Sequence, residues 1–405
     1  MNEANQTTPS GKKGKKILLA VLLAVLALLI IAAIAIWSTW HNEISSVMSL
    51  KQISVRNDEH LDGSVYRMDI SGGYYFDEYL EQGGAATDAD LISFITEHIT
   101  KGLLNMSISE SNIGCSSFTG TTGAGDRIFA RNYDFAKTNT CIIFTNPGGG
   151  RHASISTTDL QFVGIDQEKD VTGLMDKIKC LAAVYTPLDG INDAGVSCGI
   201  YMTYQGSETV ATDQNTEKPD LTSTTMLRMI LDYADDVDEA VAMISQFDLH
   251  DSANTSYHYM IADASGKSAI LEWITGTDDT DNDGSQRELV VTYNDTDTAV
   301  DNPAYQCVTN FIVSPGYYDG VAEEEKKGFD RYEHILDRLK ENNGIFADEE
   351  EAMTLLSEVG RRTWNNDDNN GCTVHSVIYN LTDKTVLWTG NEHYGEEDYT
   401  FEFGF

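Results

Sequence analysis

The sequence predicts an α+β protein that follows a single N-terminal transmembrane helix. Residues 17–37 form an apolar run without a charged side chain, which is typical of a membrane-spanning helix. In the remaining chain, segments with the hydrophobic period of strands are interspersed with segments of helical period. The strands cluster, then the helices, then strands again, and this order favours separate α and β layers over alternating βαβ units.

The composition excludes two broad classes of protein. The chain has 405 residues, with 27 Lys and Arg against 64 Asp and Glu, and a formal net charge of −37. Such a chain lacks the dense cationic face that phosphate binding needs, so we expect no nucleic-acid partner. Hydrophobic residues make up 41% of the chain, which is enough for a large core and argues against disorder.

The N-terminal apolar run is long enough to cross a membrane. It has 21 residues, and a helix needs about 20 to span the bilayer core. Lysines between positions 12 and 16 precede it. This predicts a cytoplasmic tail over residues 1–16, a signal-anchor over residues 17–40 and an extracytoplasmic remainder of a single-pass cell-membrane protein. The alternative is a cleaved signal peptide, whose apolar core normally has about 7–15 residues.

Residues 41–114 predict a polar stem followed by a helix. Apolar residues between positions 53 and 70 have strand-like spacing. Residues 87–90 (Thr-Asp-Ala-Asp) resemble a capping box. Leu91, Ile95 and Ile99 follow at helical spacing, and we expect their helix to end near residues 102–105.

From Cys115 onward, short strands alternate with turns and a few helices. The expected strands span residues 115–118, 128–135, 141–146, 152–157, 196–203, 257–262, 268–274, 289–293, 306–310, 374–380 and 385–389. The expected helices span residues 224–247, 331–342 and 348–359. The glycine-rich residues 120–125 match neither the Rossmann nor the P-loop spacing, so we interpret them as a hairpin turn.

Motifs for metal or cofactor binding are weak. Residues 279–284 resemble the start of an EF-hand loop, but Val290 stands where a bidentate Glu is needed, which favours an acidic surface turn. The sequence has no His-Glu-x-x-His or Cys-x-x-Cys pattern, and we predict neither a metal nor a cofactor. His152, His258 and His375 lie in strand-like segments, and we interpret them as structural or surface histidines.

The cysteines leave the redox state of the protein open. Cys141, Cys180, Cys198, Cys307 and Cys372 all lie in apolar surroundings. Buried thiols and one or two disulfides are both compatible with an extracytoplasmic protein. The spacing does not choose between them.

The most informative segment for chemistry begins at residues 114–118 (Gly-Cys-Ser-Ser-Phe). A thiol at the start of a strand is followed by a hairpin whose returning strand carries Arg131 and Asp134. These two residues are three apart, so they lie on opposite faces unless the strand ends or twists there. Taken alone, Cys115 could equally be a small core residue.

Further motifs follow in a fixed order. They are Asp-Gly-Ile-Asn at 189–192 with Gly195, Asp-Ala-Ser-Gly-Lys at 263–267 with Glu272, Val-Thr-Asn at 308–310, Arg-Tyr at 331–332 and a closing hairpin at 374–389. Together with Cys115 and Arg-Asn-Tyr-Asp at 131–134, this set resembles the linear amide C–N hydrolases. This family is also called the choloylglycine hydrolases, and it belongs to the N-terminal-nucleophile (Ntn) hydrolases. The resemblance implies an αββα sandwich and hydrolysis of an N-acyl amide.

The resemblance also implies roles for six residues. Cys115 would be the nucleophile, with its own α-amine as the base, and Arg131 would favour the thiolate. Asp134 would hold the α-amino group, and Arg331 would support the charge around the site. The side-chain amide of Asn310 and the backbone N–H of Asn192 would form the oxyanion hole. For Asn192, Asn310 and Arg331, the alternative is a capping or surface residue.

The position of Cys115 requires an additional step. Because 114 residues precede it, a free α-amine needs cleavage of the Gly114–Cys115 bond. We expect self-cleavage, in which the thiol attacks the preceding carbonyl, as in the autoproteolytic relatives. Residues 41–114 would then be a stem and a pro-segment or small subunit, and residues 115–405 the catalytic domain. All six cysteines lie at or after Cys115, so no disulfide would join the two chains.

Several functions remain open at this point. The sequence favours a hydrolase that takes a small-molecule N-acyl amide and reaches the membrane through its N-terminal helix. An acyltransferase with the same acyl-enzyme, a non-catalytic membrane-tethered binding protein of the same fold and a papain-like Cys–His enzyme are the alternatives. The acyl and amine parts of the substrate and the oligomeric state are not indicated.

Overall fold

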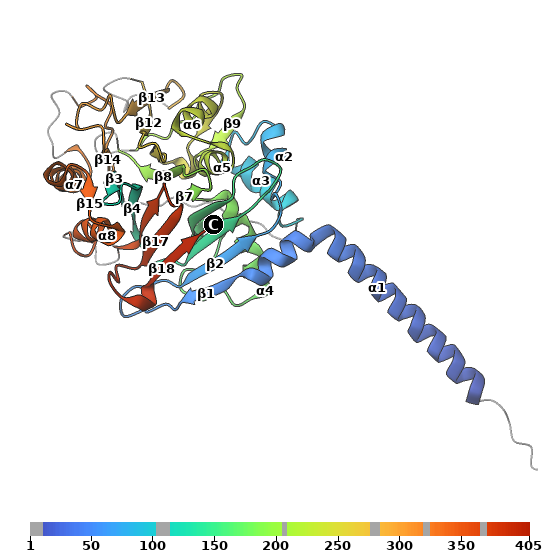
Figure 1. The fold of residues 1–405 in the computed structure, drawn as a ribbon. Helices are drawn as coiled ribbons and strands as arrows, with labels where there is room; N and C mark the ends of the chain where they lie inside the picture. The colour runs from blue at the N-terminus through green and yellow to red at the C-terminus, as the bar shows by residue number, and fades with distance from the viewer. Residues whose placement is uncertain (1–10, 103–113, 205–208, 276–283, 319–324, 365–370) are drawn as a thin grey trace, which may run out of the picture.

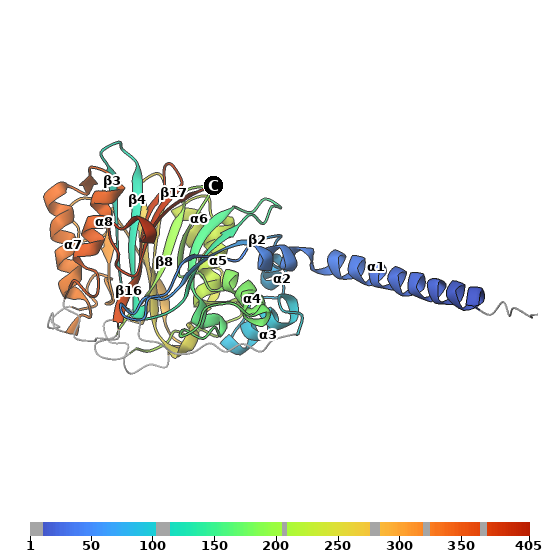
Figure 2. The same ribbon diagram turned by 90° about the horizontal axis from the view of Figure 1, so that it is seen from below.

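Two β-sheets stack face to face between two layers of helices (Figures 1 and 2). The structure is a computed structural model, and it describes residues 11–102, 114–204, 209–275, 284–318, 325–364 and 371–405. The arrangement confirms the expected α+β class and the αββα layering. The sheets form separate layers because each has one face of apolar side chains that is buried against the other sheet.

One layer is a nine-stranded sheet in the order β1-β2-β5-β6-β7-β8-β11-β12-β13. Most neighbouring strands are antiparallel, but β2 and β5 pair in parallel. The strands are β1 (Lys51–Ser54), β2 (Val65–Ile70), β5 (Thr140–Thr145), β6 (Ser154–Asp159), β7 (Asp189–Asn192), β8 (Ser197–Met202), β11 (Tyr257–Ala262), β12 (Ser268–Ile274) and β13 (Glu288–Tyr293).

The other layer is a seven-stranded sheet in the order β14-β3-β4-β16-β17-β18, with β15 paired to β3. The expected hairpin turn at residues 120–125 joins β3 to β4, where Thr122 N–H bonds the Asp126 carbonyl. The strands are β3 (Gly114–Thr122), β4 (Arg127–Ala136), β14 (Cys307–Val308), β15 (Ile345–Phe346), β16 (Gly371–Asn380), β17 (Thr385–Gly390) and β18 (Thr400–Gly404).

The helices cover the outer faces. Helix α5 (Ser223–Tyr233) lies on β7 and β8, and α7 (Phe329–Asn342) and α8 (Glu349–Glu358) lie on the seven-stranded sheet. The single helix expected over residues 224–247 is wrong in one respect. Ala234 is extended and Asp236 caps a second helix, α6 (Val237–Ile244), because an Asp side chain competes well for free N–H groups at a helix start.

Shorter elements complete the fold. They are α2 (Phe76–Glu81), α3 (Asp88–His98), α4 (Leu174–Lys179), β9 (Asp220–Thr222), β10 (Asp248–His250) and the 3₁₀ turns Leu160–Val163, Cys180–Tyr185, Ser252–Asn254 and Glu397–Tyr399. The predicted cap of α3 is confirmed, since the Thr87 side chain accepts the Asp90 N–H. The EF-hand-like residues 279–283 lie outside the described residues.

The segment before Cys115 is built into the sandwich. Strand β2 extends the nine-stranded sheet by pairing with β5 along its whole length. Phe76, Tyr79 and Phe94 are buried and pack their rings around Tyr185 of the later chain. Residues 51–98 therefore share one core with the residues that follow Cys115.

A long N-terminal helix, α1 (Gly11–Ser49), projects away from the sandwich (Figure 1). Its most apolar window has a mean hydropathy of 3.4 and is not buried by the rest of the protein. Length and composition thus make it a candidate for a membrane span or a signal sequence. Non-helical dihedral angles at Trp40 kink the helix where it nears the folded domain.

All six cysteines lie in the described part of the chain, and each is a free, buried thiol. The structure therefore favours buried thiols over the disulfides that the sequence left open.

Candidate active site

Cys115 lies near the start of β3, which stands between the terminal strand β14 and β4 in the seven-stranded sheet. Its side chain is fully buried and points toward the other sheet, with Sγ 3.8 Å from the Ile200 carbonyl oxygen of β8. The hairpin explains this placement, because β4 returns alongside β3 and pairs Cys115 with Tyr133. The thiol therefore lies between the two layers.

Arg131 of β4 reaches the sulfur from the same inner face. Its Nη2 lies 3.4 Å from Cys115 Sγ and donates to the Ile200 carbonyl at 2.6 Å, while Nη1 donates to the Leu188 carbonyl. Nη1 also lies 3.4 Å from Asp189 Oδ2, and both of these side chains are fully buried. The expected proximity of thiol and guanidinium is thus present.

Burial and charge act in opposite directions on the Cys115 thiol. Burial raises its pKa above the ordinary value, the Arg131 charge lowers it, and the Asp134 charge raises it. The net direction is upward, because loss of hydration disfavours the thiolate more than one nearby cation favours it. In the uncut chain the sulfur is therefore predominantly a neutral thiol.

The backbone of Cys115 is held by residues from distant segments. Arg331 of α7 donates from Nη1 to the Cys115 carbonyl oxygen at 3.0 Å. The Cys115 N–H donates to Asn310 Oδ1 at 3.2 Å, and Arg331 Nη2 donates to the same oxygen at 2.7 Å. The structure thus brings Asn310 and Arg331 together at the residue that the sequence proposed as the nucleophile.

Asp134 lies on the other face of β4 from Arg131, as strand alternation predicts. Its Oδ2 forms an ion pair with Arg331 Nη1 at 3.2 Å, and its Oδ1 accepts the Thr373 hydroxyl at 2.7 Å. In the register of the sheet, Asp134 is the partner of Gly114. The carboxylate therefore lies beside Gly114, the residue that precedes Cys115.

Asn192 is engaged within the turn between β7 and β8. Its backbone N–H donates to the Val196 carbonyl at 2.9 Å, and the oxyanion role that the resemblance implied stays a prediction. Its side chain donates to the Ala234 carbonyl and accepts from the Val196 and Ala194 N–H groups. Asn192 therefore closes the β7–β8 turn, which is the capping alternative that the sequence left open.

The amide of Asn310 is also engaged. Its Nδ2 donates to the Met202 carbonyl at 2.7 Å. Its loop is anchored by a buried pair, because His258 Nδ1 lies 2.8 Å from Glu272 Oε1 and the Glu272 carboxylate accepts from the Val313 and Ser314 N–H groups. Glu272 stood in one of the sequence motifs, but nothing in the sequence alone indicated this anchoring role.

The histidines lie elsewhere. Within the described ranges, Cys115 Sγ has Arg131 and the Ile200 carbonyl as hydrogen-bonding partners, and neither is a histidine. His375 binds Asp189, and His258 binds Glu272 and the Thr309 carbonyl. This arrangement does not support a papain-like Cys–His pair. Across the described residues, no group of three or more His, Cys, Asp or Glu side chains is placed to hold a metal ion.

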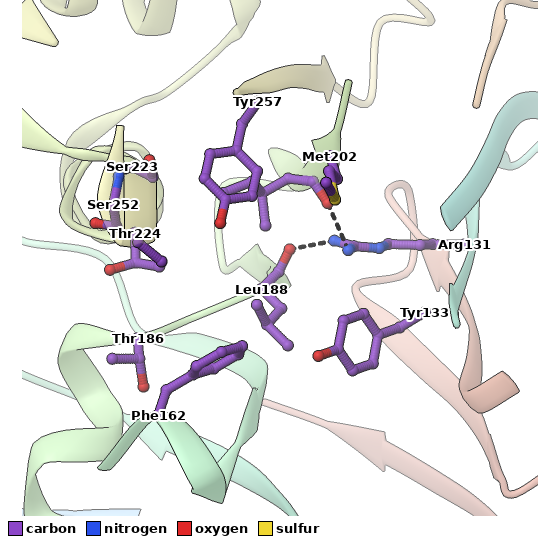
Figure 3. A pocket seen from close by; sticks show the side chains of 12 residues that line it. Arg131, Tyr133, Phe162, Thr186, Leu188, Met202, Ser223, Thr224, Ser252 and Tyr257 are labelled. Carbon is purple, nitrogen blue, oxygen red and sulfur yellow. Dashed lines mark hydrogen bonds between the residues drawn. The ribbon is translucent and has the colours of Figure 1, made fainter. Parts of the chain in front are cut away.

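A cavity adjoins Arg131 and the Ile200 and Met202 segment of β8 (Figure 3). Arg131 and Tyr133 lie on one side of it, and Ser223, Thr224 and Ser252 lie on the opposite side. Its other lining residues are Phe162, Thr186, Leu188, Ala253 and Tyr257. Among these residues only Arg131 carries a charge, and its Nη atoms are directed at main-chain carbonyls and Asp189. The cavity therefore suits an uncharged, largely apolar group.

An αββα sandwich with a cysteine at the start of an inner strand has the architecture of an Ntn hydrolase. Residues 115–279 match the family of linear amide C–N hydrolases, choloylglycine hydrolase family, and the match begins at Cys115. This part of the chain is thus similar to the linear amide C–N hydrolases. None of the curated proteins compared with the chain matches it.

Three solved structures illustrate what the chain is similar to. Penicillin V acylase from Agrobacterium tumefaciens is 18% identical, with a TM-score of 0.45, 68% of this chain covered and 83% of that one. A variant of conjugated bile acid hydrolase from Clostridium perfringens is 14% identical, with a TM-score of 0.48 and coverage of 72% and 92%. The N-acylethanolamine-hydrolyzing acid amidase ortholog of Caenorhabditis elegans is 16% identical, with a TM-score of 0.40 and coverage of 71% and 100%.

Proposed function

We propose that this protein is a membrane-anchored amide hydrolase that forms an acyl-enzyme on Cys115 after cleaving its own chain before this residue. One observation carries the proposal. The thiol, the N–H and the carbonyl of Cys115 are each held by a different side chain, Arg131, Asn310 and Arg331 respectively. A small core cysteine needs none of these contacts, whereas a nucleophile must be fixed in position.

The self-cleavage step uses the thiol and the peptide bond that precedes it. Cys115 Sγ attacks the Gly114 carbonyl carbon, the Gly114–Cys115 C–N bond breaks, and the thiol proton passes to the departing nitrogen. Water then hydrolyses the thioester, which leaves a Gly114 carboxylate, a free thiol and a free α-amine. Arg331 and Asn310 hold both backbone ends of Cys115 during this rearrangement.

The product of cleavage has the groups needed for turnover. The α-amine replaces an amide N–H that already lies 3.2 Å from Asn310 Oδ1, so the same oxygen can hold it. An α-amine has a pKa of about 7.7–8.0, which suits a base at neutral pH. It takes the thiol proton as Sγ attacks the substrate amide and returns it to the leaving amine. Water then hydrolyses the thioester and releases the acid.

The cavity beside Arg131 supports an acyl group that is neutral and largely apolar. A charged acyl group would lose its hydration there without gaining an opposite charge, because Arg131 is already paired with Asp189. Helix α1 supports membrane anchoring by its length and hydropathy, with the sandwich on the extracytoplasmic side because of the lysines that precede the helix.

Intact mass and N-terminal sequencing of the full-length protein in detergent test this proposal. Wild type should give one chain that ends at Gly114 and one that begins at Cys115, and Cys115→Ala should remain uncut. Cleaved wild type should hydrolyse neutral N-acyl amides in a substrate panel, and added amines would reveal acyl transfer as a second product. A wild-type chain that remains whole would contradict the proposal.

A further inference from the structure

Arg131 carries its charge in the space between the two sheets. The Leu188 and Ile200 carbonyls fix the guanidinium but carry no charge. The opposite charge comes from Asp189, whose Oδ2 lies 3.4 Å from Nη1, and neither side chain is exposed. A buried cation needs such a partner, because it has lost its hydration.

Asp189 is in turn held from the opposite sheet. His375 Nε2 lies 2.8 Å from Oδ2, and the Tyr379 hydroxyl donates to Oδ1 at 2.5 Å. Both residues belong to β16, where they flank Val377, the register partner of Arg131. Alternate residues of a strand share one face. His375 and Tyr379 therefore reach Asp189 from the same inner face that carries Arg131.

The carboxylate suits this position better than any neutral side chain. Burial alone would raise the pKa of Asp189, but the His375 and Arg131 charges and the hydrogen bonds outweigh it and lower the pKa. Arg131 forms an ion pair with Asp189, while His375 and Tyr379 bind its two oxygens. A carboxylate offers acceptors and negative charge to all three side chains, whereas an amide has no charge and would turn its own N–H groups toward at least one of them.

We propose that Asp189, His375 and Tyr379 are positioning residues that hold the Arg131 guanidinium against the sulfur of Cys115. They act through Arg131, because their described hydrogen bonds converge on Asp189 and not on Cys115. The inference rests on the proposed function in that Cys115 is the nucleophile. It goes further because it makes the ionisation of the Cys115 thiol depend on a network of side chains that spans both sheets.

The pH dependence of Cys115 alkylation tests the inference. Full-length wild type, Asp189→Asn, His375→Ala, His375→Gln and Tyr379→Phe are treated with iodoacetamide, and modification of the Cys115 peptide is followed by mass spectrometry. Displacing Arg131 removes the cation that favours the thiolate. Asp189→Asn and His375→Ala should therefore shift the profile to higher pH and slow alkylation at pH 8 by about threefold or more.

The two His375 variants separate positioning from mere packing. Gln can place an N–H close to the position of His Nε2, so His375→Gln should restore the wild-type profile while His375→Ala does not. In cleaved protein, His375→Ala should lower kcat more than it changes KM, because Arg131 acts on the sulfur and not on substrate binding. If Asp189→Asn does not fold, the comparison of His375→Ala with His375→Gln still tests whether the network positions Arg131.

A second buried trio supplies the matched control. The Tyr74 hydroxyl binds Asp232 at 2.6 Å, and Asp232 pairs with Arg228 at 2.7 Å, all in the interior. Tyr74→Phe and Asp232→Asn should destabilise the protein but leave the Cys115 profile unchanged. Unchanged profiles in Asp189→Asn and His375→Ala, or equal shifts in the control variants, would overturn the inference. Failure of the wild type to self-cleave would instead overturn the proposed function, since alkylation needs no cleavage.

Discussion

Arg331 donates to the carbonyl oxygen of Cys115 at 3.0 Å across 216 residues of sequence. The same guanidinium binds Asp134 at 3.2 Å and Asn310 at 2.7 Å. One side chain from the start of α7 thus joins the strand of Cys115, the returning strand β4 and the loop after β14. Arg331, for which the sequence left a surface residue as the alternative, is thus one of the best-connected residues of the proposed site.

Substitution of Arg331 should slow self-cleavage. Lysine keeps the charge but has no fork that reaches three acceptors, so Arg331→Lys should retain partial cleavage and Arg331→Ala should slow it roughly 10- to 100-fold. Time courses of chain cleavage after synthesis measure this effect. Arg338→Ala is the control on the same helix, because Arg338 is 42% exposed and its ion pairs among the described residues are with Glu341 and Glu358. Normal cleavage in Arg331→Ala would contradict the role.

Gly114 should tolerate only a small side chain. A Cβ at this position would lie 3.1 Å from Asp134 Cβ and 3.2 Å from Asp134 Oδ2. Gly114→Ala therefore needs a shift of a few tenths of an ångström and should cleave a few-fold more slowly, whereas Gly114→Val would displace the carboxylate from Arg331 and cleave much more slowly. Mass spectrometry of purified protein gives the cleaved fraction. Gly173→Val, at the surface start of α4, should cleave normally.

The catalytic chain should remain on the membrane after self-cleavage through non-covalent contacts alone. Strand β2 is paired with β5, Phe76 and Tyr79 are buried against Tyr185, and all cysteines are free thiols located after the cut. The chain from Cys115 onward should therefore sediment with membranes in high salt and enter the supernatant in concentrated urea.

Variants that weaken the packing between the segment before Cys115 and the later chain provide a matched pair for the sedimentation experiment. Phe76→Ala removes a fully buried ring, at a cost of about 3–5 kcal/mol, and should release the catalytic chain at lower urea concentration. Val55→Ala, at an exposed position of the same segment, should not. A catalytic chain that stays in the pellet after full denaturation would mean that a covalent link or a second attachment exists.

The sequence predicted much of the fold because its signals were local. Alternation marked the hairpin that carries Cys115 and Arg131, and the cap at Thr87 marked the start of α3. The pairing of β2 with β5 could not be predicted in this way, since parallel partners are distant in sequence and leave no turn signal between them. The stem therefore looked separate, although its strands extend the core sheet.

The candidate site residues could be predicted only where the order of the sequence motifs was enough to assign them. Arg131 and Arg331 were placed by motif, and both contact Cys115. The part that Asn192 plays in closing the β7–β8 turn could not be decided from the sequence, because an Asn before a turn has the same sequence signature whether it binds substrate or closes the turn. Asp189 stood in a motif without an assigned role and Thr373 in none, since the contacts of both residues come from other strands.

A buried carboxylate should make stability fall as pH rises. Burial raises the pKa of Asp251 from 3.8 to about 6, despite hydrogen bonds from Thr212 and Ser223. The native state thus keeps a proton that the unfolded state has released between these values. The stabilisation is present below about pH 4 and is lost by pH 7, a change of about 3 kcal/mol from this group.

Asp251→Asn isolates this contribution from the other carboxylates. The amide keeps an acceptor for the Thr212 N–H, and the Ser223 hydroxyl can accept from it, so the variant should fold. The free energy of unfolding of this variant, measured in urea, should increase relative to that of wild type between pH 5 and pH 8. Asp238→Asn, at an exposed position of α6, should show no such trend. A difference in stability between wild type and Asp251→Asn that stays constant over this range would mean that Asp251 is ionised in the native state throughout. In that case Asp251 would accept the hydrogen bond from Ser223, which lines the cavity, as a charged carboxylate.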